Sequence, residues 1–262
     1  MILDRIVQAT EKRVSEQKKL VSALSMKSQA LALPVTEDFP FQAALAAPEL
    51  SFICEVKKAS PSKGVIAEDF PYLTIAQEYE RAGAAAVSVL TEPDFFQGSG
   101  KYLREISESI SLPVLRKDFI IDAYQIYEAK CLGASAVLLI AAILEEKQLH
   151  SFLELTHSLG LSALVEAHTE EETDKALKAG AKIIGVNNRN LQTFEVDLNN
   201  SLNLRRLVPP EISFVAESGI KSAEDIKKLI EAGVNGVLIG ETLMRSPDKK
   251  AALEELKGKN HG

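Results

Sequence analysis

The sequence predicts an α/β protein, a (β/α)8 barrel preceded by an N-terminal helical extension. Eight short apolar runs begin near Ser51, Ala84, Leu112, Ser135, Ala163, Ile183, Ser213 and Gly236. The 185 residues from Ser51 to Gly236 contain seven intervals of about 26 residues, enough for a strand, a loop and a crossover helix. Strands that alternate with helices form a parallel sheet, and eight such units favour closure into a TIM barrel.

Length and composition favour one domain. The chain has 262 residues, of which 46% are apolar and 26% charged, as in ordinary globular proteins. This length suits two small domains or one large barrel, and the repeat favours a single (β/α)8 domain over residues 1–262. Residues 1–48 lie outside the repeat and hold too few apolar side chains to fill a core of their own. We therefore expect them to be an extension packed on the barrel.

The extension itself should contain two helices. Ile2 to Leu24 is predicted as one helix, and the Ala-rich segment Phe41 to Ala47 as a second, short one. Leu33-Pro34 and the Pro40 region between them read as a linker. Such an extension would either close the base of the barrel or border the active site.

Charge and targeting signals predict a soluble, cytoplasmic protein. The net charge of −7 excludes a basic footprint for nucleic acid. No apolar run reaches the roughly 18 residues of a membrane span, and the N-terminus lacks the pattern of a signal peptide. Cys54 and Cys131 lie in or beside apolar stretches and read as buried thiols in a reducing compartment. Both a monomer and a homodimer are compatible with the sequence.

Several helices have marked ends. Glycine follows four helical stretches at Gly83, Gly133, Gly180 and Gly233, where it can adopt the left-handed cap conformation at little cost. Thr169 and Ser222 precede two of these stretches, those that end at Gly180 and Gly233, as predicted N-caps with carboxylates in the first turn. These boundaries support the alternation of strands and helices.

An acid and a base end the first strand, which begins at Ser51. Glu55 and Lys57 are two residues apart, so they point to the same face, inside the barrel. A polar loop from Lys58 to Gly64, stiffened by Pro61, follows and could offer Ser60 to a ligand. The alternative is an internal Glu–Lys ion pair below a solvated loop. Because buried ion pairs contribute little to stability, the presence of such a pair would itself favour a functional role.

Lysine and glutamate also end the third and fifth strands. Lys117 alternates with Leu115 and should point inward, with Arg116 outward. In a barrel mouth near other cations, Lys117 should have a lowered pKa and could act as a general acid or form a Schiff base. Glu166 ends the fifth strand and faces the same cavity. Alternatively, Lys117 simply pairs with Glu55 or Glu166, and both interpretations can hold together.

Amides and a guanidinium follow the sixth strand. Asn187 and Arg189 share a face and suit ligand hydroxyls and a carboxylate or phosphate. We interpret Asn188 and Asn190 as turn residues.

The last two strands end in glycine turns before helices. These are Ala216-Glu-Ser-Gly-Ile220 and Val237-Leu-Ile-Gly-Glu-Thr242. Such turns bare backbone N–H groups, and the helix N-termini that follow add positive potential. Adjacent turns on the last two strands are typical of the phosphate site of barrels. The alternative is two plain tight turns.

Metal and nucleotide sites are not indicated. His150 and His157 fall in a predicted helix, His261 in a tail, and His168 most simply in a loop beside the mouth. No cysteine pair has ligand spacing, and neither a Gly-x-Gly-x-x-Gly motif nor a P-loop occurs. We therefore expect no metal and no cofactor.

The motifs resemble, in order, those of the indole-3-glycerol phosphate synthase family. They are Glu55-Val-Lys57 with Ala59-Ser-Pro-Ser-Lys-Gly64, Thr91-Glu-Pro-Asp-Phe-Phe-Gln-Gly98, Arg116-Lys-Asp-Phe119, Leu164-Val-Glu-Ala-His168, Gly185-Val-Asn-Asn-Arg189, Ala216-Glu-Ser-Gly219 and Leu238-Ile-Gly240. The resemblance spans nearly the whole chain, and no second, fused isomerase barrel is expected. It implies a carboxy-lyase of tryptophan biosynthesis. Its phosphosugar substrate is 1-(2-carboxyphenylamino)-1-deoxyribulose 5-phosphate, which loses CO2 and water to give indole-3-glycerol phosphate.

The resemblance also implies roles for particular residues. Lys117 is the general acid for ring closure, and Glu166, Lys57 and Glu55 are the candidates for acid and base in the dehydration. We favour Lys57 as the group that holds the substrate carboxylate, and Glu166 as the partner of Lys117 or as the base. The remaining assignments are Asn187 and Arg189 at the aromatic and carboxylate end, Glu217 near the sugar hydroxyls, Phe119 and Leu238 as apolar walls, and Ser60, Ser218, Gly219, Gly240 and Glu241 at the phosphate, the last three through backbone N–H.

Two rival interpretations remain. A phosphoribosylanthranilate isomerase-like barrel would use one acid and one base and would not need Glu55 and Lys57 together with Lys117. A phosphosugar-binding or partner-binding barrel without activity would not need Glu55, Lys57, Lys117 and Glu166 all to be present.

Overall fold

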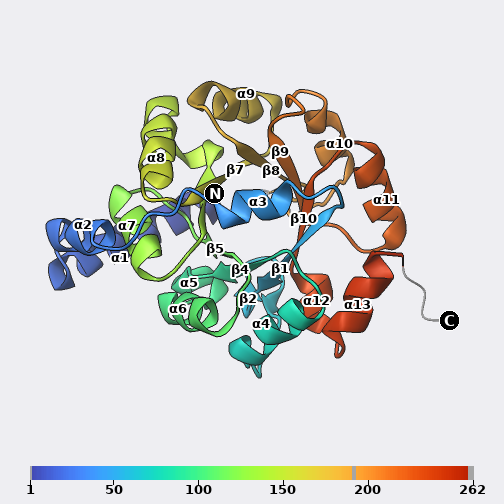
Figure 1. The fold of residues 1–262 in the computed structure, drawn as a ribbon, viewed down its shortest axis with the longest axis horizontal. Coiled ribbons are helices and arrows are strands. Elements are labelled where there is room, and N and C mark those ends of the chain that lie inside the picture. The colour runs from blue at the N-terminus through green and yellow to red at the C-terminus, as the bar shows by residue number, and fades with distance from the viewer. Residues whose placement is uncertain (1, 191–192, 259–262) are drawn as a thin grey trace.

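The computed structural model describes residues 2–190 and 193–258 and confirms the barrel (Figure 1). Within these ranges, eight parallel strands close into one sheet in the order β1-β10-β9-β8-β7-β6-β5-β4. The strands are β1 (Ser51–Val56), β4 (Ala86–Leu90), β5 (Val114–Lys117), β6 (Ala136–Ile140), β7 (Ser162–Ala167), β8 (Ile183–Asn187), β9 (Ser213–Glu217) and β10 (Gly236–Ile239). Each begins within two residues of its predicted start.

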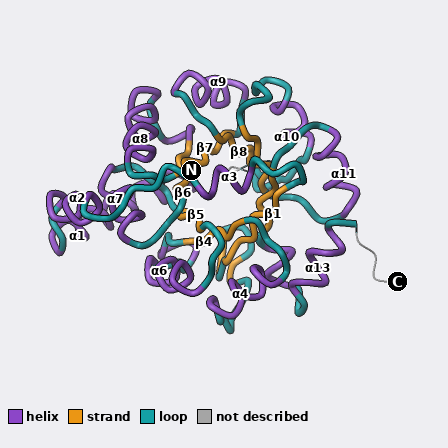
Figure 2. Tube along the Cα trace, in the orientation of Figure 1, coloured by secondary structure: helices purple, strands orange, loops and turns teal. Residues whose placement is uncertain are grey.

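Helices surround the ring of strands on its outside (Figure 2). They are α4 (Tyr72–Arg81), α5 (Pro93–Phe96), α6 (Gly100–Ser109), α7 (Ala123–Cys131), the 3-10 helix η1 (Ala141–Ile143), α8 (Glu146–Ser158), α9 (Glu170–Ala179), α10 (Asn199–Arg205), α11 (Ala223–Glu231), α12 (Glu241–Arg245) and α13 (Lys249–Leu256). The predicted caps are confirmed. Gly83, Gly133, Gly180 and Gly233 all have φ between +78° and +93°, and Ser222 and Thr169 cap α11 and α9.

Two apolar layers hold the barrel. The inner layer is made of side chains that point into the barrel, including Ile53, Leu115, Leu164 and Val215. The outer layer packs the opposite faces of the strands against the helices, with Val87, Val137 and Phe214 fully buried. Because side chains alternate along a strand, the same alternation decides which polar residues at the strand ends enter the barrel.

The N-terminal extension differs in part from the prediction. Helix α1 (Ile2–Leu20) ends four residues earlier than predicted, and α2 (Ala23–Leu31) follows it as an unpredicted helix. The break lies at Ser22, whose hydroxyl accepts a hydrogen bond from the Ser25 amide and so caps α2. The short helix α3 (Pro40–Leu45) agrees with the second predicted helix.

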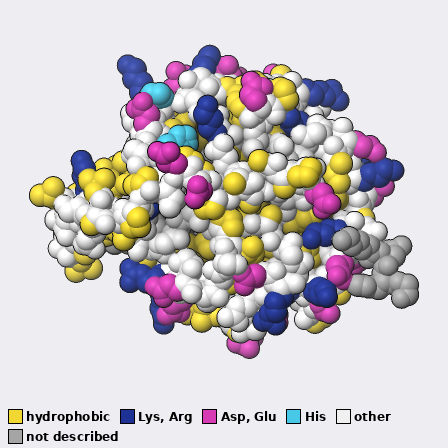
Figure 3. Space-filling model, in the orientation of Figure 1, with side chains coloured by type: hydrophobic (Ala, Val, Ile, Leu, Met, Phe, Trp, Pro, Cys, Tyr) yellow, Lys and Arg dark blue, Asp and Glu magenta, His cyan; other side chains and the backbone are white. Residues whose placement is uncertain are grey.

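The extension reaches both ends of the barrel. Helix α3 lies across the ring in Figure 1, and its Phe41 and Leu45 belong to the inner apolar layer. Helix α1 contributes Ile2, Leu3 and Ile6 to a cavity at the other end. Leu20 of α1 and Leu24 of α2 are exposed. Apolar side chains gather at the left edge of the space-filling view, where Figure 1 places α1 and α2 (Figure 3).

The two cysteines are free, as predicted, although only Cys54 is fully buried. Burial raises the pKa of the Cys54 thiol to about 12, so it stays protonated and unreactive. Cys131, expected to be buried, is half-buried at the end of α7. Among the described helices, none is both long and apolar enough to cross a membrane.

Candidate active site

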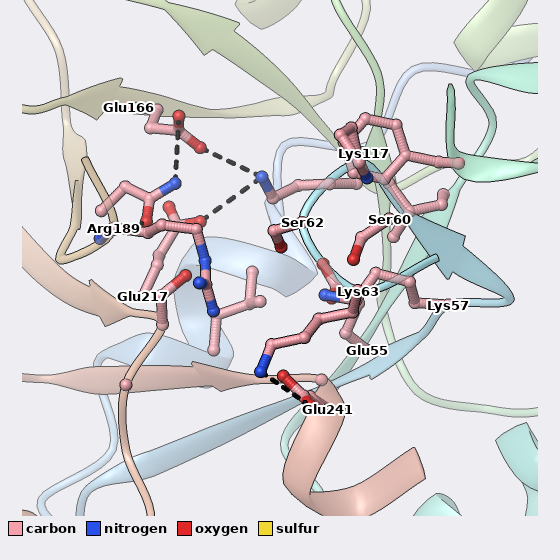
Figure 4. Close-up of a pocket in the computed structure, with 18 of the residues that line it drawn as sticks. Glu55, Lys57, Ser60, Ser62, Lys63, Lys117, Glu166, Arg189, Glu217 and Glu241 are labelled. Carbon is pink, nitrogen blue, oxygen red and sulfur yellow. Dashed lines mark hydrogen bonds and ion pairs between the residues drawn. The ribbon is translucent and has the colours of Figure 1, made fainter. Parts of the chain in front are cut away.

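The carboxyl ends of the strands surround a cavity of about 360 Å³. The sequence assigned fourteen residues to a site, and the structure brings all of them to the wall of this cavity. They are Glu55, Lys57, Ser60, Lys117, Phe119, Glu166, Asn187, Arg189, Glu217, Ser218, Gly219, Leu238, Gly240 and Glu241. Figure 4 shows many of these side chains pointing toward one another from different strands.

Lys117 is surrounded by carboxylates. It ends β5 on the inward face, and its Nζ lies 3.0 Å from Glu166 Oε2 and 3.5 Å from Glu217 Oε2 (Figure 4). Burial by itself lowers the pKa of Lys117, but attraction to Glu166, Glu217 and Glu55 outweighs burial and raises it. The predicted lowering was therefore wrong, since the neighbours of Lys117 are anions. The side chain is an ammonium ion at neutral pH.

Glu55 and Lys57 form an ion pair on the inward face of β1, as the alternation predicted. Glu55 is 3% exposed, and Lys57 is its ion-pair partner. Both side chains lie close to Gly240 of the turn after β10. A Cβ atom at Gly240 would overlap the Glu55 carboxylate and come within 2.8 Å of Lys57 Nζ. The glycine therefore makes room for the ion pair at this edge of the cavity.

Glu166 combines several contacts. Its Oε2 accepts from Lys117, and its Oε1 lies 3.5 Å from Asn187 Nδ2. Burial tends to raise the pKa of Glu166, but Lys117, His168 and Asn187 together lower it below its ordinary range. Glu166 is thus a carboxylate beside an ammonium ion. Both interpretations of the sequence, ion-pair partner and cavity residue, hold together.

Glu217 is the unusual carboxyl group of the cavity. It ends β9, and Gly185 on β8 leaves the space that its Oε1 occupies. Burial raises the pKa of Glu217 to about 7; Lys117 opposes this rise, while Glu166 and Glu55 add to it. Glu217 therefore exchanges its proton near neutral pH, unlike Glu166.

This raised pKa predicts how stability depends on pH. The folded protein holds the Glu217 proton more tightly than the unfolded chain, so the resulting stabilisation is present below pH 4.5 and lost as pH rises to about 7. Glu217→Gln cannot ionise. We expect the free energy of unfolding of this variant, relative to that of the unsubstituted protein, to increase by up to about 3 kcal/mol as pH rises from 4.5 to 8. Urea unfolding of both proteins at several pH values measures the gain, and a constant difference would contradict it.

The segment after β8 is held by amides. Asn187 Oδ1 accepts from the Arg189 amide at 3.0 Å, and Arg189 Nη1 donates to the Phe194 carbonyl at 3.2 Å. Asn188, interpreted as a turn residue, is buried and joins two elements: it accepts from Ser201 and donates to the Ser218 carbonyl. Asn190 accepts from the Thr193 amide within the following turn.

The turns after β9 and β10 form the neighbouring part of the cavity wall. Ser218 and Gly219 both have left-handed backbone, with φ of +66° and +81°. For Ser218 this conformation is strained, and such strain gathers at functional sites. Glu241 starts α12, and its carboxylate pairs with Arg245 Nε at 3.1 Å and Lys63 Nζ at 3.5 Å. Lys63 comes from the hairpin of β2 (Ala59–Ser60) and β3 (Gly64–Val65), a segment predicted as a loop.

The sequence missed a buried network next to Lys117. Asp118 accepts from Arg13 of α1 at 2.7 Å, from Thr91 at 2.6 Å and from Arg116 at 3.1 Å. Arg116 points away from the barrel interior, as predicted, and also bonds Glu128 of α7. This network ties α1 to the end of β5. Pairing across 105 residues leaves no local pattern that could have predicted it.

His168 was also underestimated. It lies in the loop between β7 and α9, as predicted, but it is part-buried, with Nε2 3.4 Å from Glu166 Oε1 and Nδ1 3.3 Å from Glu172 Oε2. The signal was present, since Glu166 and His168 are two apart and share a face. His150 and His157 lie in α8 as predicted, and His261 lies outside the described residues. Within the described ranges, His, Cys, Asp and Glu side chains form no cluster suited to a metal.

Nearly the whole chain matches one known protein family. Residues 3–256 match the family model described as "Indole-3-glycerol phosphate synthase". A protein of that name from Endomicrobium trichonymphae is 58% identical over 257 residues, which cover 98% of this chain and 100% of that protein. Another from Ruminiclostridium cellulolyticum is 56% identical over 258 residues, covering 98% and 99%.

Solved structures support the fold. A crystal structure of 3-hexulose-6-phosphate synthase superposes with a TM-score of 0.65 at 14% identity, covering 80% of this chain and 99% of that one. At this identity the likeness concerns the barrel alone. The family match and the relatives extend over nearly the full length of the chain. The chain belongs to the indole-3-glycerol phosphate synthase family.

Proposed function

We propose that the cavity converts 1-(2-carboxyphenylamino)-1-deoxyribulose 5-phosphate into indole-3-glycerol phosphate, CO2 and water. The observation that carries this proposal is the position of Lys117, an ammonium ion held between Glu166 and Glu217 and facing the cavity from β5. Ring closure needs a proton donor at a ketone oxygen. It also needs carboxylates that stabilise the positive charge developing on the substrate nitrogen.

Lys117 would act in the first step. The ring carbon that bears the carboxylate attacks the ketone carbon, pushed by the anilino nitrogen, and the ketone oxygen takes a proton from Lys117. The raised pKa of Lys117 keeps this proton in place at neutral pH. Formation of a Schiff base requires a neutral amine, so the same raised pKa favours the general-acid role. Because the substrate nitrogen supplies the electrons, this step requires no cofactor.

The remaining steps complete the indole. CO2 leaves from the same ring carbon, and its bonding electrons restore the aromatic ring. The new hydroxyl group then departs as water after taking a proton from an acid, while a base removes a proton from the adjacent carbon. Lys57 and Glu166 are the groups that we assign to these two transfers. Glu55, which pairs with Lys57, would hold that ammonium ion in place.

Binding would use three parts of the wall. Phe119 and Leu238 offer apolar surface to the aromatic ring, and the inward positions of Asn187 and Arg189 suit its carboxylate end. Lys57 would neutralise the carboxylate, with Glu217 near the sugar hydroxyls. The amides of Gly219, Gly240 and Glu241, with Ser60 and Ser218, would hold the phosphate, because two adjacent turns of this kind form the phosphate site common in barrels.

The phosphate assignment predicts an anion in this position. In crystals grown with sulfate or phosphate, we expect one anion between the turns after β9 and β10, bonded to the amides of Gly219 and Gly240. Both turns line the cavity, and turns that precede helix N-termini are typical sites for an anion. An unoccupied position at high sulfate concentration would contradict the assignment.

The activity itself is tested by a fluorescence assay. Purified protein is mixed with the carboxyphenylamino-deoxyribulose phosphate, and the indole product is followed by its emission. We expect turnover without an added cofactor. A protein that makes no indole but isomerises phosphoribosylanthranilate would instead be an isomerase, and one that binds the substrate unchanged would be a binding protein.

A further inference from the structure

His168 lies between two carboxylates, one of which lines the cavity. It directly follows β7, and its Nε2 is 3.4 Å from Glu166 Oε1, while its Nδ1 is 3.3 Å from Glu172 Oε2. Glu172 is fixed in turn, because the same Oε2 accepts the His168 backbone amide at 2.7 Å. Lys117, Glu166, His168 and Glu172 therefore form a continuous chain of charges from the cavity to the first turn of α9.

The Nδ1 atom is within hydrogen-bond distance of Glu172, whereas Nε2 faces Glu166 at ion-pair distance without a hydrogen bond. Only a protonated ring presents an N–H to both carboxylates. A neutral imidazole carries one N–H, so one of its nitrogens would turn a lone pair toward a carboxylate. The other charged groups around the ring are Glu217 on β9 and, beyond Glu166, Lys117 on β5. From α10, Asn200 donates to the backbone carbonyl of His168 and not to its ring. Burial lowers the pKa of His168, but Glu172, Glu166 and Glu217 outweigh burial and raise it.

We infer that His168 is a positioning residue that, as an imidazolium ion, holds the Glu166 carboxylate in the orientation that keeps its other oxygen on Lys117. This inference rests on the proposed function, since it assigns His168 to the same reaction. Glu166 lines the cavity and His168 does not, so His168 acts through Glu166 and not on the substrate. Glu172 holds His168 in the same way from α9.

The inference predicts a dependence on pH. A histidine whose pKa is raised keeps its ion pairs below that pKa and loses them as pH rises through it. Glu166 would then lose one of the groups that orient it, and kcat would fall on the alkaline side. His168→Gln can still donate one hydrogen bond but carries no charge. We expect its kcat to be about 10- to 30-fold lower at pH 7, with KM little changed, because Glu166 loses the positive charge that lies 3.4 Å from its Oε1.

A control and a second variant separate positioning from packing. His150→Gln alters a histidine that pairs with Glu154 on the surface of α8, and it should leave kcat and the pH profile unchanged. Glu172→Gln keeps His168 but removes one of its two carboxylates. In that variant the pKa of His168, measured by NMR on labelled histidine, should fall, and the alkaline decline of kcat should move to lower pH by a similar amount.

The outcomes distinguish the two proposals. If the unsubstituted protein makes no indole, the proposed function is wrong. If that protein is active and His168→Gln keeps both its kcat and its pH profile, the function stands and the role of His168 is wrong. Should His168→Gln fail to fold, the NMR titration of the unsubstituted protein decides. His168 must be protonated at pH 7 there, and a neutral ring would overturn the inference.

Discussion

Lys117→Ala should lose at least about 10³-fold in kcat while the barrel stays folded, since general acid catalysis typically contributes factors of 10² to 10⁴. The substitution removes an ammonium ion that contacts both Glu166 and Glu217. Nothing then delivers a proton to the ketone oxygen or balances its developing negative charge. Stopped-flow or steady-state indole fluorescence measures the loss.

Two controls accompany this measurement. Lys178→Ala removes a lysine of α9 that is 61% exposed and pairs with Asp174, far from the cavity wall, and should have normal kcat. Far-ultraviolet circular dichroism of Lys117→Ala should match that of the unsubstituted protein. A loss of folded structure would assign Lys117 to stability, and a normal kcat in a folded variant would remove it from the mechanism.

Glu166→Gln should have the second-largest effect, a decrease in kcat of about 10²- to 10³-fold. Glutamine has nearly the same shape as glutamate and can still accept from Asn187, but it carries no charge. It can neither stabilise a cationic anilino nitrogen nor act as a base. Because Glu166 is the foremost of the carboxylates that raise the pKa of Lys117, that pKa should fall in the variant.

The pH profile identifies this mechanism. In Glu166→Gln, residual activity should decline on the alkaline side at a lower pH than in the unsubstituted protein, because Lys117 gives up its proton sooner. Glu166→Asp keeps the charge on a shorter side chain and should recover part of the activity. Equal kcat in Glu166→Gln and the unsubstituted protein would show that the charge of Glu166 is not used.

The sequence predicted the strands well because each depends on local pattern. Alternation along β1, β5 and β7 placed Glu55, Lys57, Lys117 and Glu166 inside the barrel, and parallel pairing then brought the strand ends together. The capping glycines and Ser222 were also predictable, because a helix cap depends on residues only a few positions away in the sequence. Helix α2 was missed although Ser22 offered a local cap signal, because the helical pattern around it appeared continuous.

Electrostatics could not be predicted in the same way. Whether the pKa of Lys117 rises or falls depends on which charges lie within a few ångströms, and those charges come from β7, β9 and β1. These neighbours come together only in the folded barrel, so the expected lowering of the Lys117 pKa had the wrong sign. Likewise, the bond between Arg13 and Asp118 depends on how α1 packs across the mouth of the barrel.

The most direct test follows both products of the proposed reaction at once. The unsubstituted protein is incubated, without added cofactor, with substrate that carries ¹³C in its carboxyl group. Indole fluorescence and labelled CO2 are recorded over the same time course. If ring closure and decarboxylation belong to one reaction in this cavity, the two should appear in equal amounts, and both should vanish in Lys117→Ala. Release of CO2 without indole, or equal rates in the two proteins, would contradict the proposed mechanism.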